Sequence, residues 1–433
     1  MLDIKFIREN KDLIKGAALK KHLKFDVEAL LAVDDKRRDL LMAVETTRSE
    51  QNKIDEEVAT LLRSAPFTSG SPTADDTKQR DDLLEKSKKE KAALAEKEEA
   101  LKEITKDWQT LMVQVPNIPD ISVPDGDSDK DNKEVRNWGE KPKFSFDVRS
   151  HIDLMKQHDL IDLERGSKVA GFRGYILKND AVMLSFAIHQ LILEKFSNKG
   201  FVPLIVPSLV KKAPLIGTGY LPQGEEDLYK TQDGDYLAGT AEVATMGYYM
   251  DEVVDVKKPI KFAGFSQCFR REAGSHGKDT KGLIRVHEFS KFEQVVLCEA
   301  NHETSVALHE EITANAEEIL QALNLPYRVV INCGADLGLG QVKKYDIETW
   351  VPSENTYRET HSASYFHDFQ ARRFNIRYKD QDGKLKFVHS LNNTIIALPR
   401  ILVPIIENNQ NEDGSINIPE ALRPYMRGKT KIG

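Results

Sequence analysis

Cysteine is scarce in this sequence, and the few cysteines present form no recognisable pattern. The chain of 433 residues holds 3 of them, Cys268, Cys298 and Cys333, widely spaced and without a C-x-x-C pair. Such a set argues against a disulfide framework and against a structural zinc site. We therefore expect a reducing compartment, a cytoplasmic location and no zinc.

Long apolar runs and the common nucleotide-binding signatures are also missing. No apolar stretch approaches the length of a membrane span, and the first residues, MLDIKFIREN, lack the apolar core of a secretory signal. There is neither a G-x-x-x-x-G-K-[ST] phosphate loop nor a strand–GxGxxG–helix unit. The net charge of −7 leaves room for a local basic surface that binds RNA. We expect no membrane partner, and any nucleotide site must stand on another scaffold.

Glycine, proline and aromatic residues are rare in the first quarter of the chain, where Lys, Glu, Ala and Leu dominate. Two heptad-spaced segments flank a polar break at 64–76, which predicts an antiparallel helical hairpin, a coiled-coil arm, within residues 1–112. Composition of this kind usually means a dimerisation coiled coil or a spacer; a rigid arm that carries a binding surface is the alternative. The predicted seam residues are Leu40, Val44, Thr47, Gln51, Ile54, Val58 and Leu61, then Leu84, Ser87, Lys91, Leu94, Glu98, Leu101, Ile104 or Thr105, Trp108 and Leu111.

A stretch dense in Pro, Asp, Gly and Asn, 113–143, is typical of a linker, and a mixed α/β region begins at about residue 144. Because several predicted strands follow one another without a helix between them, we expect an α+β fold with an antiparallel sheet flanked by helices. Helices are expected at 181–199, 303–323 and 398–409. Strands are expected near 200–210, 236, 261–270, 283–298, 328–332, 345–351, 374–378 and 385–389.

Arginines stand among apolar neighbours at both ends of the segment FRREAGSHGKDTKGLIRVHEF. We expect two strands here, with Arg270 and Glu272 on one face of the first and Arg285, His287 and Phe289 on one face of the second. Guanidinium groups bind phosphate or carboxylate bidentately, and an aromatic ring stacks on a base. The segment therefore favours a nucleotide-binding site. The alternative is a hairpin whose charged residues form structural salt bridges.

Two later segments offer groups for the same chemistry. In YRETHSAS, Glu359 and Ser362 carry oxygen atoms that can share a Mg²⁺ ion, although E-x-x-S is a common spacing. In HSLNNTIIALPRILVPIIENNQ, Arg400 stands at the predicted start of an apolar helix, a position suited to an anion. The alternative for this segment is a helix capped by Asn393 or Thr394, with Arg400 as a surface charge.

Acidic groups suited to an ammonium ion occur in two places. Thr240 and Glu242 alternate in GTAEV, and Glu293 lies on the same predicted strand face as Phe289. No Ser–His–Asp, Cys–His or paired-acid arrangement suggests a protein nucleophile. These residues therefore favour binding and charge stabilisation over covalent catalysis.

Taken together, these segments resemble the seryl-tRNA synthetase family of class II aminoacyl-tRNA synthetases over nearly the whole chain. KGFVPLIVPSLV, near 190–214, looks like motif 1, the dimer-interface element of the class. FRREAGSHGKDTKGLIRVHEF, near 262–298, looks like motif 2, and LNNTIIALPRILVPIIE, near 389–410, looks like motif 3. TWVPSENTYRETHSASYFHDFQARR and NEDGSINIPEALRPYM are also similar to that family. The resemblance implies a class II catalytic core over 144–433 and makes residues 1–112 a tRNA-binding arm.

The implied function is ATP-dependent activation of L-serine to seryl-adenylate, followed by transfer of the seryl group to the 3′-terminal adenosine of serine tRNA. Whether selenocysteine tRNA is also charged stays open. The implied partners are ATP, L-serine, tRNA bound by the arm and the motif 2 loop, and a second copy of the chain bound through motif 1. Mg²⁺ accompanies ATP as the implied cofactor.

The resemblance also assigns roles to individual residues, with Arg270, Glu359 and Arg400 as the catalytic set. Mg²⁺ is assigned to Glu359 and Ser362. The implied ATP-binding residues are Arg270, Arg271, Glu272, Arg285, Val286, Phe289, Glu359, Thr360, His361, Ser362 and Arg400. The implied serine-binding residues are Thr240, Ala241, Glu242, Arg270, Glu293, Asn392 and Thr394.

Three other functions fit parts of the pattern. An enzyme that adenylates a substrate and loads a carrier should lack a full tRNA arm, and an inactive paralogue should have lost an arginine or the metal glutamate. Another class II synthetase should carry a Cys/His zinc set, or an anticodon domain after motif 3, where only 33 residues follow Arg400. None of these features is found, so the seryl assignment is preferred.

Overall fold

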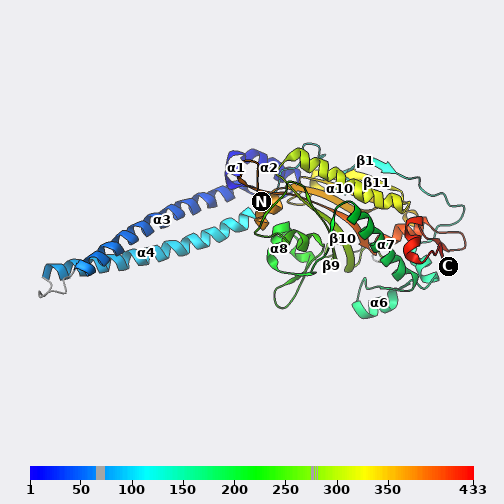
Figure 1. Ribbon diagram of the computed structural model, residues 1–433, viewed down its shortest axis with the longest axis horizontal. Helices are drawn as coiled ribbons and strands as arrows, with labels where there is room; N and C mark the ends of the chain where they lie inside the picture. Colours follow the sequence, from blue (N-terminus) through cyan, green and yellow to red (C-terminus); the bar gives the residue numbers. More distant parts are fainter. Residues whose placement is uncertain (65–73, 275–276, 278, 280) are drawn as a thin grey trace. The chain divides into compact units, whose positions relative to one another are not determined.

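The computed structural model describes residues 1–433 except 65–73, 275–276, 278 and 280, and it omits the side chains of 61–64, 74–77 and 79 (Figure 1). Residues 65–73 of the predicted polar break at 64–76 and part of the motif 2 loop therefore lie outside the described residues. Two compact units are present, Phe25–Val115 and a larger one formed by Met1–Lys24 with Pro116–Gly433. The structure thus places the first 24 residues with the body, whereas the arm was predicted to begin at residue 1.

The smaller unit is a pair of long helices, α3 (Val27–Ser64) and α4 (Ala74–Met112), which lie side by side (Figure 1). The first predicted seam is confirmed where four of its members are buried between the helices. These are Val44, Thr47, Gln51 and Ile54. Hydrophobic and polar groups at heptad spacing meet here because that spacing keeps one stripe of a helix against its partner.

The predicted seam of α4 is wrong at three positions. Leu84, Lys91 and Glu98 are exposed, and the residues just before them, such as Leu83 and Lys97, are the more shielded ones. This one-residue shift could not be predicted from apolar spacing, because one of the shielded residues is a lysine. The ammonium group of Lys97 donates to Thr47 Oγ1 at 2.7 Å. Ser87, Leu94, Leu101 and Trp108 keep the predicted positions.

The larger unit is built on a sheet of eight strands (Figure 1). All neighbouring pairs are antiparallel except β4 with β9, which confirms the predicted antiparallel sheet. In spatial order the strands are β1 (Lys133–Trp138), β11 (Tyr327–Ile331), β12 (Lys343–Val351), β13 (Thr356–His367), β16 (His389–Leu398), β10 (Glu288–Cys298), β9 (Ile260–Phe269) and β4 (Val202–Ile205).

Helices cover both faces of this sheet. On one face, α7 (Asp180–Asn198) and α10 (His302–Ala322) complete the main core, and the carbonyl of Ile312 in α10 accepts hydrogen bonds from Gln294 of β10 and Asn393 of β16. On the other face, α9 (Glu242–Gly247) and α11 (Phe369–Phe374) pack on Val295 and Leu297 of β10. Because side chains alternate along a strand, residues next to Gln294 and Asn393 point to the α9 face.

Short elements complete the larger unit. The remaining helices are α1 (Ile4–Glu9), α2 (Lys11–Lys20), α5 (His151–Gln157), α6 (Leu163–Ala170), α8 (Lys212–Thr218) and α12 (Leu402–Asn408). The remaining strands are β2 (Ile161–Asp162), β3 (Ile176–Leu177), β5 (Leu209–Val210), β6 (Tyr229–Lys230), β7 (Tyr236–Leu237), β8 (Val253–Val254), β14 (Arg377–Lys379), β15 (Leu385–Phe387), β17 (Ile416–Asn417) and β18 (Lys431–Ile432). Within the described ranges, no helix combines the length and the apolar character needed to cross a bilayer.

Three predicted boundaries differ from the structure. The predicted linker 113–143 contains β1, which pairs with β11 at the edge of the sheet. The strand predicted at 283–298 begins only at Glu288, because its pairing with β9 ends at Phe269. The helix predicted at 398–409 begins at Leu402, and the residues before it form β16 and a turn, so Asn393 and Thr394 cap no helix.

Candidate active site

A cavity of about 520 Å³ opens on the α9 face of the sheet, over β10, β13 and β16. Thirteen of the residues predicted from the sequence line it, although they come from segments more than 150 residues apart. They are Glu242, Arg270, Glu272, Arg285, Val286, Phe289, Glu293, Glu359, Thr360, Ser362, Asn392, Thr394 and Arg400.

Arg270 lies just beyond the end of β9, where its guanidinium group faces the cavity. Its Nε donates to the carbonyl of Gly239 at 3.1 Å, and the guanidinium carbon lies 5.3 Å from the ring centre of Phe289. Its backbone N–H donates to the carbonyl of His287 at 2.9 Å. The side chain is thereby fixed at its base, and the rest of its fork remains directed at the cavity.

Arg285 lies on the segment between the motif 2 loop and β10. Its Nη1 donates to Glu272 Oε2 at 2.5 Å, and its Nε donates to Asp279 Oδ2 at 3.3 Å. Asp279 also accepts from Arg358. Glu272 therefore orients Arg285, whereas the sequence placed Glu272 on one strand face with Arg270. The backbone φ of Glu272 is 56°, in the left-handed region. Arg270 and Glu272 therefore do not share the regular strand geometry that the sequence suggested.

Arg400 closes the same end of the cavity from the turn between β16 and α12. Its Nε donates to the carbonyl of Ile284 at 2.9 Å, and its Nη1 donates to the carbonyl of Glu359 at 3.1 Å. Burial lowers its pKa below the usual value, and the charges of Arg270 and Arg285 add to this effect, whereas Glu359 opposes it. Three guanidinium groups converge here, which makes this end of the cavity an anion site.

A β-bulge brings Glu359 and Ser362 to one face of β13. Residues three apart on a regular strand point to opposite faces, but the register jumps from Ile347–His361 to Glu348–Glu359, so Thr360 is inserted as an extra residue. Glu359 and Ser362 therefore both line the cavity. The sequence suggested the pair from its oxygen atoms, and the bulge supplies the geometry.

Buried carboxylates occupy the opposite end. Glu242, at the start of α9, accepts from Gln370 Nε2 at 2.7 Å, and burial together with repulsion by Glu293 raises the pKa of Glu242 to about 7. Glu293 accepts from Thr394 Oγ1 at 3.4 Å and forms an ion pair with Lys291 Nζ at 2.6 Å. Two acids, one cation and a hydroxyl in a small space suit a zwitterion whose ammonium group faces the acids.

Four of the predicted site residues do not line the cavity. Arg271 is exposed, and its backbone N–H donates to the carbonyl of Asp227. Thr240 and Ala241 are buried beneath Glu242, whose backbone N–H donates to Thr240 Oγ1 at 3.3 Å. His361 is buried, with its Nε2 3.0 Å from the carbonyl of Ile395.

The predicted shared face of Arg285, His287 and Phe289 is wrong. Residues 283–287 precede β10, so strand alternation does not apply to them. Arg285 and Phe289 line the cavity, whereas the His287 ring contacts Phe172 and Tyr229.

One cavity residue and one residue that supports the cavity wall were missed from the sequence. Lys291 lies between Phe289 and Glu293 on β10, and counting in twos from Phe289 would have placed it in the cavity. Gln370 donates a hydrogen bond to Glu242, 128 residues away in the sequence, and no local sequence pattern predicts that contact.

Comparisons with known families cover most of the chain. Residues 1–119 match the family described as the seryl-tRNA synthetase N-terminal domain, and residues 229–409 match the tRNA synthetase class II core domain (G, H, P, S and T). The serine–tRNA ligase of Deinococcus radiodurans is 45% identical over 435 residues, which cover 100% of this chain and 99% of the relative. That of Thermodesulfovibrio yellowstonii is 41% identical and covers 98% and 99%.

Solved structures agree with the sequence relatives. The seryl-tRNA synthetase of Pyrococcus horikoshii complexed with ATP has a TM-score of 0.87 and 37% identity, covering 100% of this chain and 99% of that one. The cytoplasmic serine–tRNA ligase of Naegleria fowleri in complex with AMP has a TM-score of 0.84 and 30% identity, covering 100% and 98%. Both likenesses extend over the whole chain.

Proposed function

Because the chain belongs to the seryl-tRNA synthetase family, as its motifs predicted, we propose residue roles for that family's reaction in this cavity. The protein is an ATP-dependent serine–tRNA ligase, which activates serine and charges tRNA. One observation supports the assignment of roles: a single cavity has three arginines at one end and two buried carboxylates at the other. That polarity matches ATP phosphates beside the ammonium group of an amino acid.

ATP occupies the arginine end in this proposal. Arg270 binds the α-phosphate and the carboxylate of serine, and Arg285 and Arg400 bind the γ-phosphate of a bent nucleotide. Adenine stacks on Phe289, close to the guanidinium of Arg270, with the backbone of Val286 at the ring edge and Glu272 at its amino group. Glu272 and Asp279 hold Arg285 in place, so little reorganisation accompanies binding.

Serine occupies the carboxylate end. Glu242 takes the ammonium group from its buried position, with Gln370 fixing its carboxylate, and Glu293 accepts from the serine hydroxyl. Alanine would leave that acceptor unpaired, which is a strong basis for rejection. Asn392 and Thr394, on the adjacent strand β16, form the wall that limits the size of the side chain.

Glu359 and Ser362 fit Mg²⁺, because the bulge in β13 presents one carboxylate and one hydroxyl oxygen to the cavity, and magnesium prefers such hard oxygen ligands alongside phosphates. When bound there, the ion would neutralise phosphate charge.

The first reaction step needs positioning and charge stabilisation. A carboxylate oxygen of serine forms a bond to the α-phosphorus of ATP while the bond to pyrophosphate breaks. Arg270 holds both reacting groups, and Arg285 and Arg400 stabilise the leaving pyrophosphate. No protein nucleophile is required, in keeping with the residues that line the cavity.

The helical unit Phe25–Val115 is the tRNA-binding arm in this proposal, together with the motif 2 loop. Lys86, Lys88, Lys89 and Lys91 are exposed on α4 and suit the phosphate backbone of a long RNA arm. Charging of selenocysteine tRNA would need the same contacts. In vitro charging of each purified tRNA decides which are substrates.

A homodimer through motif 1 is supported by an exposed apolar surface on α7 and the edge strand β4. Phe186 is 63% exposed, Val202 51% and Ile205 88%. Patches of this kind mark interaction sites. Sedimentation should give twice the chain mass for the wild type, and Ile205→Asp should shift it toward the monomer.

A cytoplasmic location is inferred from the three cysteines, which are unpaired and buried. Fractionation of the source cells, with activity assayed in each fraction, tests this inference.

The test of the function is ATP–pyrophosphate exchange driven by each of the twenty amino acids. Serine should give the fastest exchange, by at least about 100-fold over alanine and threonine. Equal rates for serine and alanine would refute the assignment.

A further inference from the structure

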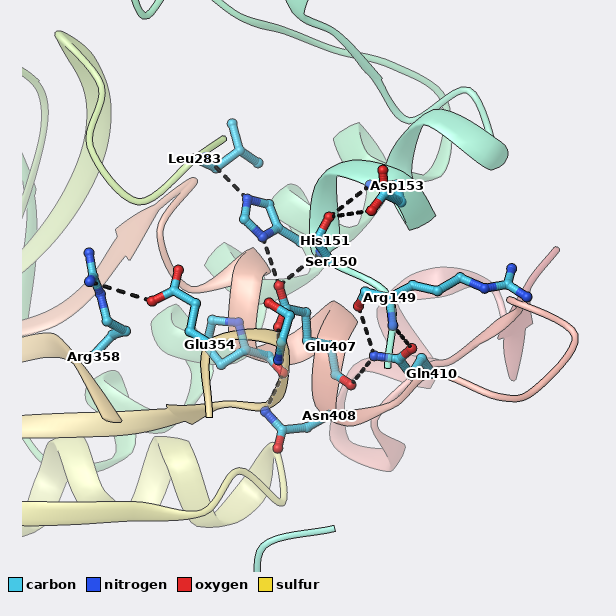
Figure 2. Close-up of polar contacts among 12 residues, drawn as sticks. Arg149, Ser150, His151, Asp153, Leu283, Glu354, Arg358, Glu407, Asn408 and Gln410 are labelled. Carbon is cyan, nitrogen blue, oxygen red and sulfur yellow. Dashed lines mark hydrogen bonds and ion pairs between the residues drawn. The ribbon is translucent and has the colours of Figure 1, made fainter. Parts of the chain in front are cut away.

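A buried histidine outside the cavity links the segment of Arg285 to the helix that follows Arg400. His151 is the first residue of α5, and its side chain is 6% exposed. Its Nδ1 lies 2.8 Å from Glu407 Oε1, and its Nε2 lies 3.3 Å from the backbone N–H nitrogen of Leu283. Figure 2 shows the imidazole between Glu407 and Leu283, with both ring nitrogens in use.

The direction of these hydrogen bonds is fixed by Glu407. Its carboxylate is fully buried and also accepts from the backbone N–H groups of His151 at 2.8 Å and Ser353 at 3.0 Å. Burial raises its pKa, but the hydrogen bonds from His151 and Ser353 outweigh burial and lower the pKa below the usual value. An ionised carboxylate only accepts, so Nδ1 carries the ring proton and Nε2 accepts from Leu283.

Both ends of this chain of hydrogen bonds belong to segments that carry an arginine of the cavity. Leu283 is followed by Ile284, whose carbonyl accepts from Arg400 Nε at 2.9 Å, and then by Arg285. Glu407 belongs to α12, which begins two residues after Arg400. The segment 283–286 is thus tied to motif 3 twice, directly through Arg400 and indirectly through His151.

The approach of the backbone to the imidazole depends on Gly282. This residue has a φ of +86°, and a Cβ atom added to it would stand 2.4 Å from His151 Nε2. Only glycine combines that backbone conformation with room for the ring. The glycine at position 282 is therefore required for the contact between Leu283 and His151.

We propose that His151 is a positioning residue for ATP, which holds segment 283–286 against α12 and so fixes Arg285 relative to Arg400. The inference rests on the proposed function, because it assumes that these arginines bind the triphosphate. Displacement of one arginine by a fraction of an ångström weakens a bidentate contact with phosphate. The serine end stands on α9, β10 and β16, so its affinity should be unaffected.

Two conservative substitutions separate the two hydrogen bonds of the ring. In His151→Gln, the amide oxygen can take the place of Nε2 and accept from Leu283. In His151→Asn, the shorter amide can replace only Nδ1 and donate to Glu407. We expect His151→Asn to raise the KM for ATP about five- to tenfold, with the KM for serine within twofold of wild type, and His151→Gln to restore most of the ATP affinity.

A second pair of variants reaches the same contact from the loop. Gly282→Ala should push Leu283 away from the imidazole while leaving the His151–Glu407 contact intact, and should raise the KM for ATP selectively. Gly383→Ala is the matched control, because Gly383 also has a positive φ, +77°, but a Cβ atom there meets no atom within 4 Å, and it should leave both KM values unchanged.

The decisive measurements are both KM values in pyrophosphate exchange and the ATP dissociation constant from calorimetry. Equal rises in both KM values, or His151→Gln no better than His151→Asn, would overturn the proposal and leave His151 a purely structural residue. Wild-type protein that binds ATP but exchanges no pyrophosphate with serine would instead refute the proposed function. The ATP dissociation constants of the variants would still test His151 in that case.

Discussion

The helical arm and the catalytic body both bury polar side chains, but with opposite results. In the arm, Thr47 and Gln51 lie in the seam and find partners on the facing helix, through Lys97 at 2.7 Å and Ser87 at 3.2 Å. In the body, Glu242 and Glu293 are buried at the wall of a cavity, where we propose that they bind serine. Buried polarity therefore specifies helix register in the arm and, in our proposal, substrate binding in the body.

The largest effect is expected in the body, from loss of a cavity arginine. Arg270→Ala should lower the rate of serine-dependent pyrophosphate exchange by about 10³-fold, because a preorganised donor to the reacting phosphate is lost. The neighbouring Arg271 is exposed and does not line the cavity. Arg271→Ala is thus the matched control, and a comparable loss there would restore the ATP-binding role that the sequence suggested for it.

The arm should be separable from activation. Replacing residues 30–105 by a short Gly/Ser linker should leave pyrophosphate exchange within about twofold of wild type, because the larger compact unit excludes Phe25–Val115. Charging of serine tRNA should fall to background, because the phosphate contacts of the arm are lost. Intact charging by the shortened protein would contradict the proposed role of the arm.

We expect the buried carboxylate of Glu242 to lower the stability of the folded protein while it contributes to serine binding. Its pKa is raised from 4.5 to about 7, so as pH rises above about 4.5 the unfolded chain loses this proton before the folded protein does. The free energy of unfolding therefore falls progressively between pH 4.5 and pH 7, and the loss is complete above pH 7. Glu242→Gln should raise the free energy of unfolding at pH 8 by about 1–3 kcal/mol while weakening serine binding at least tenfold.

Thermal melting at pH 5 and pH 8 checks the sign of this effect. The gain from Glu242→Gln should be smaller at pH 5, where the native carboxyl already carries its proton. A variant that is less stable than wild type at pH 8 would show that this carboxylate stabilises the fold instead.

The smallest effect is expected in the seam of the arm. Gln51 donates to Asp55 and Ser87, but its Oε1 is buried without a hydrogen-bond partner. Gln51→Leu should stabilise the arm by about 1 kcal/mol, seen as slower amide exchange in α3 and α4, with pyrophosphate exchange unchanged. Asn52→Leu, at an exposed position, is the control, and equal protection in both variants would argue against a seam effect.

Sequence reasoning succeeded where a local pattern and a side-chain chemistry coincide. Arg270, Arg285 and Arg400 stand among apolar neighbours, and all three line the cavity. It failed where the backbone departs from a regular element. The left-handed Glu272 took this residue off the strand face predicted for Arg270, and the late start of β10 took His287 off the face predicted for Arg285 and Phe289. Neither departure has a sequence signature, because non-glycine residues adopt them under tertiary constraint.

By itself, the sequence determined the elements and the chemistry: a heptad-spaced hairpin, an antiparallel sheet, and arginines and carboxylates able to bind ATP and serine. Only the tertiary structure decided how these groups meet. The bulge at Thr360 turns Glu359 to the face of Ser362, and Gln370 reaches Glu242 across the fold. The physical reason is that periodicity fixes neighbours within a strand or helix, whereas contacts between distant segments depend on how the whole sheet pairs and packs.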